Sequence, residues 1–213
     1  MAIYLVRHGE SVGNLNSFFV GRTDYPLTDH GIQQARQLGQ WFSTQGISFN
    51  TMYCSPLIRA RHTAELIAAT QAEQTLIIDQ RMQEFDCGLL EGLGPEEAKQ
   101  QYPDLFNRPL EEWGDLSPYG GESYDRVMNR VVEFCRELEQ HYDPDQEILV
   151  VAHGGTLLFA LVYWCALPHP RLIGVRTPNC CTIKLGLRGW RGRTLGQIEW
   201  LLPLKMLPAP NTT

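Results

Sequence analysis

The stretch Ala2–Glu10, AIYLVRHGE, joins an apolar run to a charged end that contains a glycine. Its first five residues favour a buried β-strand, because Ile, Tyr and Val have high strand preference and no charged side chain interrupts them. Arg7 and His8 follow where such a strand ends. In open α/β sheets, ligands bind just beyond the carboxyl ends of the strands. The stretch therefore predicts an α/β fold with an anion-binding loop after its first strand.

Alternating strand and helix patterns occupy most of the remaining chain. Apolar residues recur at helical spacing after Thr28 and again after Ser123, and both residues are good N-caps. Further strand-like runs lie at Met52–Cys54, Leu76–Ile78, Ile148–Ala152, Cys180–Leu185 and Thr194–Trp200. This alternation favours a three-layer α/β/α sandwich with a mostly parallel central sheet.

Ser55 and Pro56 directly follow the second of these strand-like runs. We expect Ser55 to cap a helix that has Pro56 at its first position, since serine is a common N-cap and proline is tolerated there. The helix would run to about Thr70 and would carry Arg59 in its first turn. Arg59 would then lie close to the carboxyl end of the second strand.

The almost uniformly apolar stretch Ile148–Leu167 has the length of a membrane span. However, His153–Thr156, HGGT, places a histidine and two glycines inside it. A buried strand over Ile148–Ala152, followed by a buried helix from about Thr156, is therefore the better interpretation. We predict no membrane association on this ground.

The composition changes between about residues 84 and 123, where glycine, proline and aromatic residues are frequent. We interpret this segment as a lid inserted into a single domain that spans residues 1–213. One short helix is predicted within the lid, around Glu96 to Tyr102. A chain of 213 residues is long enough to bury one substantial core, and no second independent domain is indicated.

The formal net charge of -6 argues against broad binding to nucleic acid or to anionic membranes. The six cysteines lack CxxC pairs and the spacings of zinc sites, and the N-terminus lacks a signal-peptide pattern. We therefore expect reduced thiols in a cytoplasmic protein. The adjacent Cys180 and Cys181 are predicted to be strand positions rather than a disulfide.

Polar residues of complementary chemistry follow three of the predicted strands. Arg7 and His8 follow the first strand, Arg59 follows the second, and His153 follows the Ile148–Ala152 strand. Glu84 begins the lid. Each residue alone has an ordinary structural explanation, but together they stand at equivalent points of the predicted sheet. The combination indicates one site.

These residue types suit the transfer of a phosphoryl group. Two arginines can hold phosphate oxygens with forked hydrogen bonds. A neutral histidine can attack phosphorus, and a second, protonated histidine can stabilise the charge on the oxygens. A carboxylic acid can protonate the leaving oxygen. No metal ion or cofactor is predicted, because side chains supply the positive charge and the sequence has no GxxxxGK[ST] segment.

Several segments resemble the motifs of the histidine phosphatase superfamily, which includes phosphoglycerate mutases, fructose-2,6-bisphosphatase and α-ribazole phosphatase. The three defining ones are Leu5–Ser11 (LVRHGES), Cys54–Ala60 (CSPLIRA) and Val151–Gly155 (VAHGG). Gly21–Thr28 (GRTDYPLT) is similar to the substrate loop of that family, and Gly120–Ser123 (GGES) also matches.

The resemblance implies His8 as the nucleophile and Glu84 as the proton donor. It also implies a phosphate pocket made by Arg7, Arg59 and His153.

Further substrate contacts are expected from Asn14, Gly21, Arg22 and Gly154. Asp86 is a nearby but less favoured acid. We expect the other four histidines, which are His30, His62, His141 and His169, to lie on the surface.

The lid favours hydrolysis over mutase chemistry. Mutases of this family that use 2,3-bisphosphoglycerate carry a lysine and a tandem arginine pair in a longer lid. Here the lid contains only Lys99 and Arg108. A lid with few cations should hold a doubly charged intermediate poorly, so water becomes the final acceptor.

We therefore predict a metal-independent phosphomonoester hydrolase that acts on a small phosphorylated metabolite through a phosphohistidine on His8. The alternative is a 2,3-bisphosphoglycerate-dependent phosphoglycerate mutase. A non-catalytic phosphate-binding module is more remote, because all five catalytic positions are filled. The sequence is compatible with a homodimer and does not decide the natural substrate.

Overall fold

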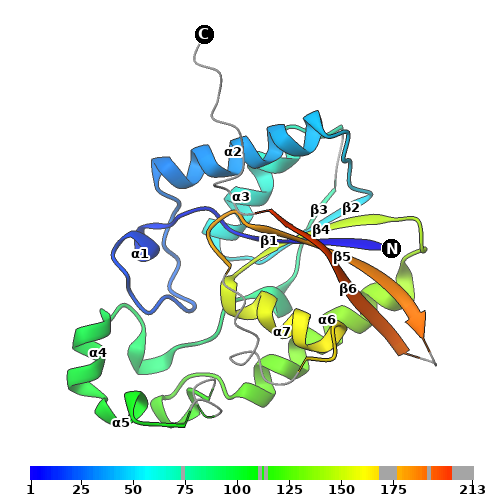
Figure 1. Ribbon diagram of the computed structural model, residues 1–213. Coiled ribbons are helices and arrows are strands. Elements are labelled where there is room, and N and C mark those ends of the chain that lie inside the picture. Colours follow the sequence, from blue (N-terminus) through cyan, green and yellow to red (C-terminus); the bar gives the residue numbers. More distant parts are fainter. Residues whose placement is uncertain (73–74, 110–111, 113–114, 168–176, 191–192, 203–213) are drawn as a thin grey trace.

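The computed structural model describes residues 1–72, 75–109, 112, 115–167, 177–190 and 193–202. A six-stranded sheet crosses the molecule in the order β3-β2-β4-β1-β5-β6 (Figure 1). Its strands are β1 (Ala2–Arg7), β2 (Thr51–Cys54), β3 (Leu76–Ile78), β4 (Glu147–Ala152), β5 (Thr182–Trp190) and β6 (Arg193–Leu202). The first four strands pair in parallel, whereas β5 pairs antiparallel with both β1 and β6. The predicted mostly parallel sheet is confirmed.

Helices cover both faces of the sheet, so the three-layer sandwich is also confirmed. Figure 1 shows α2 (Asp29–Thr44) and α3 (Ile58–Ala68) on one side, with α6 (Tyr124–His141) and α7 (Gly154–Trp164) on the other. The side chains of β1 alternate between these layers, as strand geometry requires. Ile3 and Leu5 belong to the core beneath α6 and α7, whereas Tyr4 and Val6 belong to the core beneath α2 and α3.

The register of the parallel strands aligns their carboxyl ends. Arg7 in β1 lies opposite Ala152 in β4, and the backbone N–H of His8 donates to the carbonyl of Ala152 at 3.0 Å. On the other side of β4, the N–H of Ser55 donates to the carbonyl of Val151 at 3.0 Å. The residues that follow β1, β2 and β4 therefore meet at one edge of the sheet.

The segment of residues 84–123 forms a group of short helices with a small apolar core of its own. It contains η2 (Gly88–Leu90), α4 (Pro95–Gln101), α5 (Pro103–Phe106) and η4 (Ser117–Tyr119). Two further short helices, α1 (Val12–Leu15) and η1 (Gln80–Met82), lie outside this segment. Leu90, Leu105 and Leu116 are buried among aromatic side chains of the same segment. The short helix predicted here is α4, while α5 was not predicted.

The predicted N-caps are confirmed for two helices and wrong for a third. Thr28 accepts from the N–H of Gly31 at the start of α2, and Ser123 caps α6 in the same way. Ser55 does not cap α3, which begins at Ile58 and has no cap from its own N-cap side chain.

A tertiary contact replaces the cap that Ser55 was expected to provide. The carboxylate of Asp24 accepts the N–H of Ile58 at 2.6 Å. The first N–H groups of a helix need partners from outside it, and a distant carboxylate serves as well as a local hydroxyl. The start of α3, which carries Arg59, is therefore fixed by the loop that contains Asp24.

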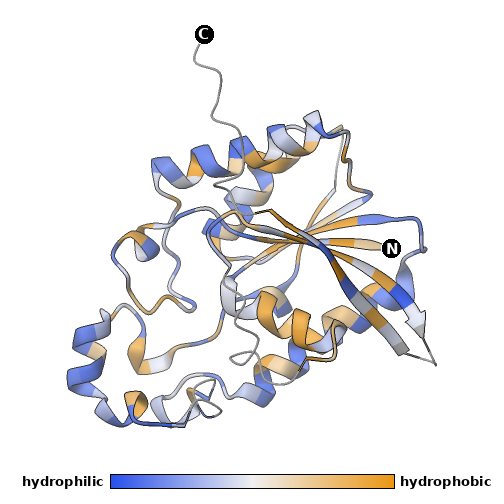
Figure 2. Ribbon diagram, viewed as in Figure 1, coloured by the Kyte–Doolittle hydropathy of each residue, from blue (hydrophilic) through white to orange (hydrophobic). Residues whose placement is uncertain are grey.

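The apolar stretch Ile148–Leu167 is a strand and a helix, as predicted, although α7 begins two residues earlier than expected. Figure 2 shows α7 coloured as hydrophobic over most of its length, which fits its position between the sheet and α6. Within the described residues, no helix is long and apolar enough to cross a membrane.

The two adjacent cysteines precede β5 rather than lie in it, so the predicted strand positions are wrong. Cys180 adopts a left-handed conformation, with φ of 54°, in a turn whose backbone bonds to Arg7 and His8. Both thiols are free and buried, and no disulfide joins them. The turn thus holds the chain before β5 against the carboxyl end of β1.

Gly31 generates the first prediction, because it permits close contact between α2 and the loop after β1. A Cβ at this position would lie 2.0 Å from the carbonyl oxygen of Glu10. We expect Gly31→Ala to lower the free energy of unfolding by about 1–3 kcal/mol through overpacking, although alanine normally favours a helix. Urea unfolding measures the change. Gly94→Ala, where a Cβ would meet nothing within 4 Å, is the control and should have a smaller effect. An equal or smaller loss for Gly31→Ala would contradict the prediction.

Candidate active site

Two buried histidines lie side by side at the carboxyl edge of the sheet. The ring centroids of His8 and His153 are 5.0 Å apart, and the rings are inclined by 60°. Only 3% of His8 is exposed to solvent, and none of His153 is. The two histidines predicted from separate motifs thus meet, because β1 and β4 pair in parallel and end together.

Local hydrogen bonds fix the tautomer of His8. Its Nδ1 lies 2.7 Å from the carbonyl oxygen of Gly9, and a carbonyl can only accept, so the proton is on Nδ1. In the neutral ring, the free electron pair is therefore on Nε2. The N–H of Gly9 donates to Thr63 Oγ1 at 3.0 Å, and Asn179 Nδ2 donates to the carbonyl of His8 at 3.1 Å. The Nε2 nitrogen of His8 is thus held at a defined place.

Two arginines flank the histidines, one half-buried (Arg7) and one buried (Arg59), and backbone carbonyls hold both of them. Arg7 Nη1 donates to the carbonyl of Thr177 at 2.6 Å. Arg59 donates from Nη2 to the carbonyl of Gly21 at 2.7 Å and from Nη1 to that of Thr23 at 2.9 Å. Because these donors are occupied, the forked grip expected from both arginines must use the remaining N–H groups.

Three buried nitrogen atoms of this cluster have no hydrogen-bond partner among the described residues. They are Arg7 Nε, Arg59 Nε and His153 Nδ1. An unpaired buried polar group costs free energy, and such groups are retained mainly where a ligand satisfies them. Two of the three are fixed guanidinium donors, so the missing partner should be an acceptor with several oxygens. A phosphoryl group meets this requirement.

Burial favours the neutral form of both histidines. Desolvation lowers the pKa of His8 well below its usual value, and the charges of Arg7 and Arg59 lower it further. The same causes lower the pKa of His153. A neutral His8 is suited to nucleophilic attack. A bound anion would act against this lowering at His153, because its negative charge favours the protonated ring.

Glu84 is anchored at the N-terminus of α7. Its carboxylate accepts the N–H groups of Gly155 at 3.0 Å and Thr156 at 3.1 Å, together with the hydroxyl of Thr156. A Cβ on Gly155 would lie only 2.7 Å from Glu84 Oε1, so this approach requires glycine. The negative charge of Glu84 partly opposes the lowering of the arginine pKa values that burial causes at Arg7 and Arg59. Glu84 thus belongs to the same cluster.

The other predicted contacts fall into different places. Asn14 Oδ1 accepts from Asn179, which also bonds to the carbonyl of His8. Gly154 begins α7 beside Arg7, where a Cβ would lie 3.6 Å from Arg7 Nε. The backbone N–H and carbonyl of Gly21 both form hydrogen bonds to protein side chains, those of Glu91 and Arg59.

Arg22 is exposed on the rim of the cluster formed by the two histidines and the two arginines. It is paired there with two acidic residues of the 84–123 segment. Its guanidinium lies 3.2 Å from Glu122 and 3.9 Å from Asp86. Glu122 in turn forms a two-point pair with Arg130, whose guanidinium also donates to the carbonyl of Glu84. The ion pairs therefore connect Arg22 to the segment that carries Glu84.

Of the four remaining histidines, His30 and His141 are exposed as expected, and His62 is half-buried. His169 lies outside the described residues.

Sequence reasoning missed two residues that support the site. Ser55 Oγ lies 2.8 Å from His153 Nε2; as a polar residue directly after a strand, it carried the same signal as Arg7. Glu91 accepts several backbone N–H groups around Gly21. A glutamate beside a glycine in a loop normally faces solvent, so no pattern singled out Glu91.

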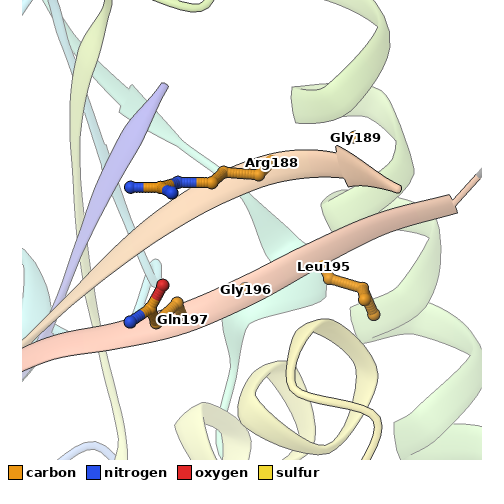
Figure 3. A pocket seen from close by; sticks show the side chains of 5 residues that line it. All are labelled: Arg188, Gly189, Leu195, Gly196 and Gln197. Atoms are coloured by element: carbon orange, nitrogen blue, oxygen red, sulfur yellow. The ribbon is translucent and has the colours of Figure 1, made fainter.

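Within the described part of the chain, neither a metal-binding group nor the pocket at the β5–β6 hairpin adds a residue to this cluster. Among the described residues, no group of three or more His, Cys, Asp or Glu is arranged to hold a metal ion. An open pocket of about 440 Å³ lies at the β5–β6 hairpin, lined by Arg188, Gly189, Leu195, Gly196 and Gln197 (Figure 3). Because Gly186 pairs with Ala2 at the start of β1, this pocket lies toward the end of the sheet opposite the histidines.

Comparisons with known proteins point to one protein family. A family model of the histidine phosphatase superfamily (branch 1) matches residues 3–197. The chain is 35% identical over 158 residues to a 2,3-bisphosphoglycerate-dependent phosphoglycerate mutase of Azorhizobium caulinodans, covering 73% of this chain and 77% of that protein. It is 31% identical over 183 residues to the adenosylcobalamin/alpha-ribazole phosphatase of Escherichia coli K12, covering 85% and 87%.

A crystal structure of the alpha-ribazole phosphatase from Shigella flexneri superposes on this fold with a TM-score of 0.80. The two sequences are 26% identical, and the match covers 93% of this chain and 95% of that one. Mutases and phosphatases are thus both similar to the chain, so similarity alone does not separate the two reactions.

The buried histidines predict a loss of stability in acid. The folded pKa of His153 is lowered, so its contribution to stability is fully present above the unfolded value of about 6.5 and is lost as the pH falls toward the folded value. We expect His153→Gln to flatten the dependence of the unfolding free energy on pH, measured with urea between about pH 5 and pH 8. His30→Gln, at an exposed histidine, should leave the dependence unchanged. A wild-type slope in His153→Gln would contradict the assignment.

Proposed function

The chain belongs to the histidine phosphatase superfamily, and we propose that it is a metal-independent hydrolase of small phosphomonoesters. One observation carries the proposal, which is the set of three unpartnered buried nitrogens beside the free Nε2 of His8. A phosphoryl group bound by Arg7 and Arg59 would present its phosphorus to that nitrogen. All six cysteines are free thiols, which supports a reducing, cytoplasmic setting for the reaction.

The proposed reaction has two steps. In the first, Nε2 of His8 attacks phosphorus, the ester P–O bond breaks, and the leaving oxygen takes a proton from Glu84, which enters this step in its protonated form. In the second, Glu84 removes a proton from water as the water oxygen attacks phosphorus and the P–N bond breaks. Inorganic phosphate and the original His8 result. The arginines and His153 would stabilise the negative charge of the oxygens in both steps.

The use of the cations in the 84–123 segment supports water as the final acceptor. Arg108 lies over the ring of Tyr119 at 5.1 Å and donates to the carbonyl of Asp115. Lys99 is exposed in the last turn of α4, and Arg22 is already paired with lid acids. A second phosphate or a carboxylate would thus find few uncommitted positive charges within the described part of this segment. The mutase alternative is favoured by the 35% identity to a mutase.

A direct assay separates the two reactions. The purified protein is incubated with 3-phosphoglycerate and catalytic 2,3-bisphosphoglycerate, and separately with a panel of phosphorylated metabolites in EDTA. We expect release of inorganic phosphate from part of the panel, with kcat/KM ranking the substrates. Rapid formation of 2-phosphoglycerate would favour the mutase instead. No turnover of any ester would favour a binding module.

The covalent step predicts that His8→Ala reduces turnover by more than about a thousandfold, because the phosphoryl acceptor is removed. Rapid acid-free quenching of the wild type with a radioactive ester should trap an acid-labile phosphoprotein. His30→Ala, at an exposed histidine, is the matched control and should retain both properties. Near wild-type turnover in His8→Ala would exclude this nucleophile.

The proton-donor role predicts a dependence on the leaving group. Glu84→Gln should slow alkyl phosphates by about 10²–10⁴-fold, because their alkoxides need a proton, and should slow good aryl leaving groups much less. Steady-state kinetics over a series of esters measures the difference. Asp86→Asn is the matched control, since Asp86 accepts the N–H of Gly88 and is directed toward Arg22. Equal slowing of all esters by Glu84→Gln would point to another acid.

A further inference from the structure

The loop of Gly21, Arg22 and Thr23 directs all three of its N–H groups at one carboxylate. Glu91 accepts from Gly21 at 3.2 Å, from Arg22 at 2.7 Å and from Thr23 at 3.1 Å. The hydroxyl of Thr23 adds a fourth bond at 2.7 Å. A fifth comes from the N–H of Cys87 at 3.1 Å. Glu91 therefore fixes the donor side of this loop and ties it to the segment that follows Glu84.

The acceptor side of the same loop holds Arg59. The carbonyls of Gly21 and Thr23 receive the two Nη groups of Arg59 at 2.7 Å and 2.9 Å. These are the outer two of the three residues whose N–H groups bind Glu91. The backbone of this loop thus lies between the carboxylate of Glu91 and the guanidinium of Arg59.

The packing of this layer leaves little freedom. A Cβ on Gly21 would lie 2.1 Å from Glu91 Oε1 and 2.2 Å from the carbonyl oxygen of Phe85. Arg59 itself is 1% exposed, so no solvent can substitute for the two carbonyls. A shift of the loop would therefore be transmitted to the guanidinium rather than absorbed by side-chain motion.

Both oxygens of Glu91 are needed as acceptors. Oε1 receives the N–H groups of Arg22 and Cys87, and Oε2 receives those of Gly21 and Thr23 together with the Thr23 hydroxyl. Burial raises the pKa of Glu91, but these hydrogen bonds outweigh it and the pKa is lowered overall. The carboxylate is therefore ionised at neutral pH. An amide could not replace it, because its NH₂ would face N–H donors.

We propose that Glu91 is a positioning residue for phosphoryl transfer, acting on the orientation of Arg59 through the backbone of residues 21–23. The proposal rests on the proposed function, in which Arg59 binds the phosphoryl group. Glu91 does not touch the reacting atoms. Its effect is to hold the unpartnered Nε of Arg59 where the phosphate oxygens arrive.

The test combines Glu91→Gln with a probe of the anion site. Tungstate mimics a phosphoryl dianion, and calorimetry gives its affinity for the folded protein. In Glu91→Gln we expect kcat/KM for a phosphate ester to fall by about 10- to 100-fold and tungstate binding to weaken by about tenfold, since small misplacements of a binding group are costly. Glu96→Gln, an exposed change in α4, is the control and should match the wild type.

A double-mutant cycle separates positioning from general stability. If Glu91 acts through Arg59, the loss caused by Glu91→Gln should largely disappear in the Arg59→Lys background. Additive losses would overturn the proposal, and so would unchanged kinetics and tungstate affinity in the single variant. Failure of the wild type to bind tungstate and to hydrolyse any ester would instead overturn the proposed function, and the inference with it.

A milder variant covers the case in which Glu91→Gln does not fold. Thr23→Val removes one of the five hydrogen bonds to Glu91 and leaves the carboxylate in place. We expect a weakening of tungstate binding by about two- to tenfold, the range for one such bond. Wild-type affinity and kinetics in Thr23→Val would overturn the proposal in that case.

Discussion

The parallel pairing of β1 with β4 is the constraint on which the site depends. The backbone bond from His8 to Ala152 is the last one between β1 and β4. The residue directly after the end of each strand is a histidine. A slip of one residue between the two strands would turn one of the two histidines to the opposite face of the sheet, because successive strand residues alternate. The register is strongly fixed, since both faces of β1 are buried under helices.

The second constraint is electrostatic. Two guanidinium groups and two neutral imidazoles are enclosed together, and burial of charge is unfavourable unless it is compensated. Glu84 supplies one compensating charge from the start of α7, and backbone carbonyls supply dipoles to the arginines. Desolvation, reinforced by the positive charges of the arginines, lowers the pKa of both histidines. Under the proposed function, the same enclosure would favour both a neutral nucleophilic histidine and a bound anion.

The sequence was sufficient for those parts that follow from local pattern. Buried strands without charges, N-caps such as Thr28 and the polar residues at strand ends were all readable, and these define the sheet and the histidine pair. Contacts between distant segments were not. Asp24, rather than Ser55, accepts a hydrogen bond at the start of α3. Glu91 accepts backbone N–H groups that lie about 70 residues away in the sequence. In both cases a short polar side chain met backbone groups that only the folded chain brings near.

The pairing of Arg22 with Glu122 and Asp86 bears on how the rim can select among substrates. A second anionic group on a ligand cannot simply add an ion pair there, because it must displace carboxylates that belong to the protein. The binding free energy gained is then the difference between the free energies of two ion pairs, rather than the full free energy of one new ion pair. Under the proposed function, such an exchange would favour substrates whose organic part beyond the phosphate is neutral.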